Sequence, residues 1–155
     1  MVNKIANGII DAIYNGLGND ADKYHYYTDG IRQNFETPCF YPKPISPRLI
    51  KRAGKGYEYN VMFVVHYFPE DPLNKTDMSS IGDVLLRCLQ TITIVTDKIG
   101  ANGSYSGQQI LRATDVNFTV NEDRVLCYAT YHLLVQESVQ AEISMGDIEF
   151  GETIK

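Results

Sequence analysis

Residues 57–68 read YEYNVMFVVHYF, and this stretch decides the fold class of the chain. Aromatic and β-branched residues at odd positions alternate with other residues at even positions, which predicts a strand with one buried face. The preceding residues 38–50 contain four prolines, which cannot donate to a strand ladder, so we expect a kinked edge strand there. The glycines at 54 and 56 form the tip between these strands. Together the two stretches predict one long β-hairpin arm over about residues 37–68.

Two stretches outside this arm have the three- and four-residue spacing of amphipathic helices. The first covers residues 5–17, with Asn3 as the expected N-cap. The second covers residues 78–92, with Asp77 as the expected N-cap. Both have one apolar stripe, so both are expected to pack on a sheet.

Three more strands complete the predicted fold. They cover about residues 23–28, 108–120 and 124–136, and the glycine-rich residues 97–107 are expected to form a loop. The order α-β-β-β-α-β-β predicts a single α+β domain over residues 1–155. Its antiparallel sheet, mixed at most, is expected to have about four to five strands with two helices packed on it.

The charge of the chain is unevenly distributed. It has 14 basic and 19 acidic residues, or −5 overall, yet residues 37–57 contain five basic residues and no acidic one. The remainder therefore carries −10, and the acidic C-terminal segment 137–155, with a short strand or helix expected near 142–150, has five acids and one lysine. The basic residues are Lys43, Arg48, Lys51, Arg52 and Lys55.

This basic cluster has three interpretations. It is a solvated arm, an arm that binds nucleic acid, or an arm that docks on the acidic body of a neighbouring copy. Nucleic-acid binding usually needs a broadly basic protein, and the pI of this chain is about 5.1. Docking between copies is the more informative hypothesis, because head-to-tail contacts of this kind close into rings.

Sequence motifs of catalysis are absent. The chain has no phosphate-binding loop, dinucleotide fingerprint, zinc-protease helix or EF-hand loop, and its three cysteines lack the paired spacing of a zinc site. His25, His66 and His132 fall on three predicted strands, where we expect polar positions on a sheet face rather than metal ligands. We therefore expect no enzyme, no cofactor and no metal.

The sequence has neither a membrane span nor a secretion signal. No stretch approaches 18 uninterrupted apolar residues, and the N-terminal MVNKIANGIIDAIYNG lacks the apolar core and cleavage site of a signal peptide. These features predict synthesis in the cytoplasm and no contact with a membrane.

Four stretches, in this order, resemble the tail terminator proteins of tailed bacteriophages of Gram-positive hosts. They are NGIIDAIYNGLGND (7–20), DGIRQNFETPCFY (29–41), YEYNVMFVVHYFPED (57–71) and VNEDRVLCYATYHLLV (120–135). The prolines within residues 42–47 depart from the more regular apolar strand that is usual in the family. The most specific positions are Gln33, Pro38, Cys39, Phe40, Tyr67, Phe68 and Pro69.

The resemblance implies a structural virion protein that forms a hexameric ring at the head-proximal end of the tail. Such a ring stops polymerisation of the tail tube and provides the surface on which the head or neck docks. The implied partners are further copies, the tube protein, a connector or neck protein, and the sheath protein if the tail is contractile. DNA would pass through the lumen without specific binding, and the gene would belong to a phage or a prophage.

Within this interpretation the five basic residues are expected to form an inter-subunit or tube-docking arm. Two alternatives stay open. The first is a head-tail joining or neck protein, which shares the small size, the ring symmetry and the lack of catalytic residues. The second is a small nucleic-acid-binding module that uses the basic hairpin.

Overall fold

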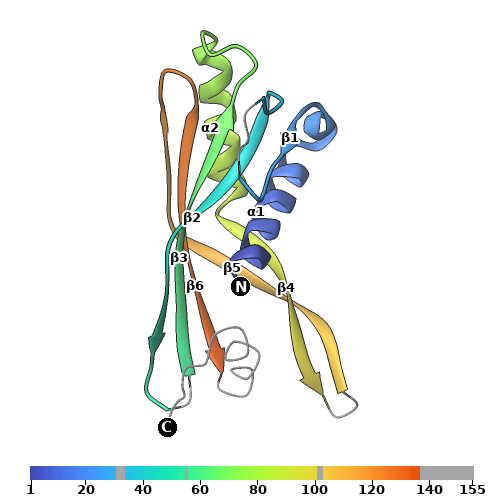
Figure 1. Cartoon of the computed structure of the whole chain (residues 1–155), viewed down its shortest axis with the longest axis vertical. Helices are drawn as coiled ribbons and strands as arrows, with labels where there is room; N and C mark the ends of the chain where they lie inside the picture. The colour runs from blue at the N-terminus through green and yellow to red at the C-terminus, as the bar shows by residue number, and fades with distance from the viewer. Residues whose placement is uncertain (31–33, 55, 101–102, 137–155) are drawn as a thin grey trace.

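The computed structural model describes residues 1–30, 34–54, 56–100 and 103–136. Within these residues two α-helices and a short 3-10 helix accompany six strands in the sheet order β1-β2-β3-β6-β5-β4 (Figure 1). The elements are α1 (Val2–Leu17), η1 (Gly18–Lys23), β1 (His25–Tyr26), β2 (Cys39–Lys51), β3 (Gly56–Phe68), α2 (Lys75–Cys88), β4 (Thr91–Gly100), β5 (Gly103–Val120) and β6 (Val125–Gln136).

The sheet is mixed. β1 pairs with β2 in parallel, and every other neighbouring pair of strands is antiparallel. The expected α+β class with two helices on a sheet is confirmed. The described part of the chain contains six strands instead of the expected four to five, because β4 was not predicted.

The core lies between the two helices and one face of the sheet. Odd-numbered residues of β3 and β6 point into it, among them Phe63 and Tyr131, both fully buried. The Tyr131 hydroxyl donates to the Leu89 carbonyl oxygen at 2.7 Å, so this buried phenol is not left without a partner. The isoleucines at 5, 9 and 13 form the buried stripe of α1, as their four-residue spacing predicts.

Both expected N-caps are wrong by a few residues. The Ile5 N–H donates to the Met1 carbonyl at 3.1 Å, so α1 has already begun when the chain reaches Asn3. In α2 the cap is Asn74, whose side-chain oxygen accepts from the Asp77 N–H at 3.1 Å. Asp77 lies in the first turn, where its negative charge favours the helix N-terminus.

The end of the second helix and the following loop were also predicted wrongly. α2 ends at Cys88, and Ile92 lies in β4, where it is paired with Leu111 of β5. Residues 91–96 read TITIVT, a run of β-branched residues that favours a strand over a helix. The expected loop 97–107 is instead the distal part of a β4–β5 hairpin.

β5 divides the sheet into two arms. Its first part pairs with β4 as far as Arg112, and its second part pairs with β6 from Ala113 onward. Below this point the β2–β3–β6 arm and the β4–β5 arm diverge, as the lower half of Figure 1 shows. The predicted hairpin arm over residues 37–68 corresponds to β2 and β3 and is confirmed.

The prolines of β2 lie where the strand needs no donor. The N–H groups of residues 25 and 27 donate to the carbonyls of Pro38 and Phe40 at 2.9 and 3.0 Å, so even-numbered residues here face away from β3. Because backbone direction alternates along a strand, Pro42 and Pro44 occupy the next two outward positions. They offer no N–H to a further strand, which explains why β1 ends after two residues and β2 is an edge strand beyond it.

Candidate functional site

The basic cluster lies along β2 and the turn that follows it. Lys43, Arg48 and Lys51 are exposed residues of β2, and Arg52 is exposed in the turn. The fifth predicted residue, Lys55, lies outside the described residues. The structure therefore places four of the five predicted cations on one continuous segment.

An irregularity in β2 brings two of these cations to the same face. The register passes from Ile45–Met62 to Arg48–Asn60, so two residues of β2 lie opposite a single residue of β3, and β2 has one extra residue here. Residues directly opposite in an antiparallel pair share a face. Lys43 therefore projects with its partner Val64, and Arg48 with Asn60, onto the face of the sheet opposite the helices. Without the extra residue, positions 43 and 48 would point to opposite faces.

Arg52 is largely neutralised by a carboxylate on the next strand. Its Nε donates to Glu58 Oε1 at 2.7 Å, and its Nη2 contacts the same oxygen. This hydrogen bond is the main reason why the pKa of Glu58 lies below its usual range. The Lys51 ammonium lies 5.3 Å from the centre of the Tyr57 ring, a cation–π contact that leaves its charge in place.

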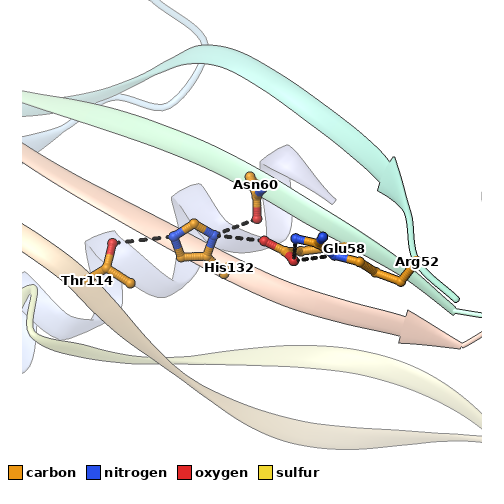
Figure 2. Close-up of polar contacts among 5 residues, drawn as sticks. All are labelled: Arg52, Glu58, Asn60, Thr114 and His132. Atoms are coloured by element: carbon orange, nitrogen blue, oxygen red, sulfur yellow. Dashed lines mark hydrogen bonds and ion pairs between the residues drawn. The ribbon is translucent and has the colours of Figure 1, made fainter.

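The Arg52–Glu58 pair continues as a polar network across three strands (Figure 2). His132 Nδ1 of β6 lies 2.5 Å from Asn60 Oδ1 and 3.3 Å from Glu58 Oε2, and its Nε2 lies 3.3 Å from Thr114 Oγ1 of β5. This network was not predicted from the sequence. The sequence did contain an indication of the network, because the alternation along β3 places the polar residues Glu58 and Asn60 on the same face.

Three of the described cations of the hairpin lie outside this polar network, and one of them, Lys51, makes the cation–π contact with Tyr57. Among the described residues, neither Lys43 nor Arg48 makes an ion pair or a hydrogen bond from its side chain. With Arg52 paired to Glu58, the charge that the described residues of the hairpin can offer to a partner comes from Lys43, Arg48 and Lys51. These three residues are the strongest candidates for an electrostatic docking contact.

The predicted motif positions converge at the other end of the same hairpin. Cys39 is paired with Phe68, and Phe40 with Tyr67, so the two motifs that are far apart in the sequence lie side by side. The Tyr67 hydroxyl donates to Asp77 Oδ2 at 3.1 Å and ties β3 to α2. Pro69, directly after β3, is buried. Gln33 lies outside the described residues.

A shallow cavity of about 590 Å³ lies beside these motif positions. Its wall includes stacked rings, with His66 5.8 Å from Tyr41 and 6.0 Å from Phe68 between ring centres. Burial, together with the charges of Arg124 and Lys43, lowers the pKa of His66, so the ring is neutral at pH 7. The cavity thus has an aromatic wall, and two basic side chains, Lys43 and Arg124, are among its lining residues.

Neither catalytic nor metal-binding chemistry emerges from the described side chains. Within this part of the chain no three His, Cys, Asp or Glu residues are placed to hold a metal ion. His66 and His132 lie on the same face of the sheet but belong to different groups of contacts, and His25 approaches Glu36 at 3.5 Å. A search of the described helices finds none long and apolar enough to cross a membrane.

The comparison with protein families decides the class of the protein. A family described as phage tail terminator protein matches residues 8–143. The chain belongs to this family. The match covers α1 from residue 8 onward, all of α2 and all six described strands, including the hairpin and the motif positions. No curated protein matches the chain.

Family membership confirms the resemblance to phage tail terminators. Tail terminators are structural proteins of the phage tail and not enzymes, in agreement with the prediction from the missing motifs. Membership in a family of tail components also implies a place in the virion and contacts with other tail or head components.

Proposed function

We propose that this tail terminator assembles as a hexameric ring at the head-proximal end of the tail tube, where it stops tube polymerisation. The observation that carries the proposal is the family match over residues 8–143. The ring then offers its far side to the connector or neck protein and, in a contractile tail, its rim to the last sheath ring. DNA slides through the lumen, because acidic walls do not hold phosphate.

We further propose that neighbouring copies contact one another head to tail through opposite charges. Lys43 and Arg48 supply positive charge on the face of the sheet opposite the helices. The helical side carries exposed carboxylates at Asp11, Asp20 and Asp83. A contact between two different surfaces of the same chain is heterologous, and it generates a closed ring when the rotation between copies fits.

Charge reversal of the two unpaired cations tests this contact. In the double variant Lys43→Glu/Arg48→Glu the proposed surface becomes repulsive towards the acidic side of its neighbour, so we expect loss of ring formation and of tail completion. Thermal unfolding of the monomer should change little, because both side chains are exposed and unpaired within the described residues.

A control variant separates surface placement from net charge. Lys4→Glu/Lys23→Glu changes the net charge by the same amount on the acidic side itself, which carries α1 and η1 and where Lys23 is paired with Asp20 at 3.0 Å, so the surface that faces the cations of the neighbour stays negative. Assembly should survive in this variant. If both double variants assemble equally well on tails, as judged by electron microscopy and sedimentation, the proposed docking role of Lys43 and Arg48 is wrong.

A further inference from the structure

An exposed apolar pair lies on the sheet face opposite the helices. Ile45 of β2 and Met62 of β3 are directly opposite one another in the register, and they are 37% and 39% exposed. Met62 alternates with Val61 and Phe63, which are buried in the core, so the pair points outward. Large apolar side chains that lie next to one another on a surface favour a contact with another protein.

Two unpaired cations flank this pair along β2. Lys43 precedes Ile45 on the same face, and Arg48 follows it after the extra residue of the strand. The β3 partners of the two cations are four residues apart, so the cations project about 13 Å from one another with the apolar pair between them. Together with Met62 they form a surface that we call the cation-flanked pair. An apolar centre with a polar rim is typical of protein–protein interfaces.

The helical side of the molecule exposes a complementary surface around Tyr14. The Tyr14 side chain of α1 is 43% exposed. Its hydroxyl donates to Asp22 Oδ1 at 2.6 Å, and the exposed Asp11 lies one helical turn before it. Asp20, in the same region, is already paired with Lys23 at 3.0 Å. The ring therefore has two carboxylates beside it, those of Asp11 and Asp22, and we call these three residues the acid-flanked tyrosine.

The Tyr14 ring is held in place before any contact forms. Besides the hydrogen bond from its hydroxyl, the ring lies 5.8 Å from the Tyr26 ring between centres, at an interplanar angle of 56°. A side chain that is already ordered loses little conformational entropy on binding. Tyrosine is also one of the residue types that most often carry the binding energy of an interface. The acid-flanked tyrosine is thus suited to be the anchor of a contact.

The two surfaces lie too far apart to meet within one molecule. Helix α1 packs on the core side of the sheet, where a Cβ atom on Gly8 would lie 2.7 Å from the Thr93 carbonyl oxygen of β4. The cation-flanked pair lies on the other side of the sheet and near the opposite end of the strand order (Figure 1). A contact between these surfaces therefore joins two copies through different surfaces, which is the heterologous arrangement of a ring.

We propose that the acid-flanked tyrosine of one copy packs on the cation-flanked pair of the next copy. The Tyr14 ring covers Ile45 and Met62, and its two carboxylates face Lys43 and Arg48. The inference rests on the head-to-tail ring proposed above and adds the apolar centre of its contact. Opposite charges fix the orientation and speed association, while burial of the ring and of the apolar pair supplies the affinity.

The outer edge of β4 is a second surface on which another copy could add. The Ala113 N–H donates to the Gln90 carbonyl at 2.9 Å, and the β4–β5 register continues from Thr91–Arg112 in the same phase. Even-numbered residues of β4 therefore bond to β5, and the N–H and C=O groups of Val95 point away from the sheet. A contact there would be made by backbone pairing. It would not bring the acid-flanked tyrosine to the cation-flanked pair, so experiment can separate the two contacts.

Cross-linking between neighbouring copies on assembled tails tests the proposed contact. Asn15→Cys lies beside Tyr14 on α1, and Thr130→Cys lies opposite Met62 on the outer sheet face, so both surfaces stay intact. In the double variant a short bis-maleimide should join the copies into a ladder of oligomers. Each single variant should give at least tenfold less cross-linked product, because the native cysteines are buried or half-buried.

An exchange of charges tests which two surfaces meet. The double charge reversal of the hairpin described above should be rescued by adding Asp11→Lys/Asp22→Lys, with at least tenfold more complete tails than the reversal alone. The control adds Glu70→Lys/Asp83→Lys to the same reversal, which changes the net charge equally at other exposed positions and should rescue nothing.

Removal of the ring tests the apolar centre separately from the charges. Tyr14→Ala should lower the yield of complete tails at least tenfold, whereas the matched control Tyr14→Phe keeps the ring and should assemble. Circular dichroism of both monomers checks that the fold is retained. Equal assembly of the two variants would contradict the role assigned to the ring.

Two further results would overturn the proposal. One is complete tails from the double cysteine variant with no more cross-linking than in the single variants. The other is equal rescue by the charge exchange and by its control. In both cases complete tails from the wild-type gene would leave the terminator function in place and assign the contact to another surface, such as the β4 edge. Failure of the wild-type gene to restore tails would instead overturn the proposed function and this contact with it.

Discussion

The two edge strands of the sheet, β2 and β4, differ in whether their outward backbone groups can pair with a further strand. At β2, Pro42 and Pro44 occupy the outward positions and remove the donors that a further strand would need. At β4, the outward donors of Val95 and its neighbours are intact, and the Val95 side chain is 54% exposed. One edge is therefore restricted to contacts through side chains such as Lys43, while the other retains the capacity for strand pairing. When copies assemble, side-chain contacts are therefore expected at the β2 edge and strand pairing at the β4 edge.

The largest expected effect separates inward from outward positions on β4. Ile94 is 1% exposed and faces β5 with its backbone, so Ile94→Pro should cost at least about 3 kcal/mol of unfolding free energy. Val95→Pro should cost much less, because its N–H faces outward. Urea unfolding of the two variants measures the difference, and equal losses would show that the assigned directions along β4 are wrong.

A smaller effect is expected when the donors are restored to β2. In the double variant Pro42→Val/Pro44→Val the edge regains two outward N–H groups, and we expect it to self-associate through strand pairing while the fold is retained. Sedimentation velocity over a range of concentrations measures this association. Pro47→Ala is the control, because residue 47 lies in the irregular part of β2 between the two paired stretches. If the double variant stays as monomeric as the wild type, the prolines do not protect this edge.

The smallest effect concerns the pH dependence of the hairpin. The folded-state pKa of Glu58 lies below its ordinary value of 4.5, mainly because of Arg52. Its contribution to stability is therefore fully present above pH 4.5 and is lost as the pH falls through the lower, folded-state pKa. Glu58→Gln should lower the melting temperature at pH 7, and this difference from wild type should shrink as the pH falls below 4.5. The exposed Glu70→Gln is the control, and a difference between Glu58→Gln and wild type that is independent of pH would contradict the role assigned to the ion pair.

The sequence was sufficient to predict the β2–β3 side of the sheet and insufficient for the β4 side. The alternation of residues 57–68 and the prolines before them each allow one interpretation, and both were confirmed. Residues 91–96 allow two, since Ile92 continues the apolar spacing of the preceding helix and also belongs to a β-branched strand pattern. The helix ends at Cys88 because the tertiary pairing of TITIVT with β5 outweighs the local helical spacing.

The sequence predicted that basic residues cluster on the hairpin, but not which of them are paired within the chain or which share a face. The sequence identified the cluster of cations but could not show that Arg52 would be paired with Glu58, since this contact depends on the register across the turn. Nor could it show that the extra residue of β2 brings Lys43 and Arg48 to one face. Both facts follow from strand pairing, and they reduce the five candidate residues to the few that can contact a partner.

Electron microscopy of particles from a phage that lacks this gene tests the proposed function most directly. A tail terminator that stops tube polymerisation predicts tails of aberrant length without heads, and restored tail length when the wild-type gene is supplied in trans. The Lys43→Glu/Arg48→Glu variant should fail to restore it, and Lys4→Glu/Lys23→Glu should succeed. Finished tails of normal length that do not join heads would contradict the account and would assign the protein to the neck instead.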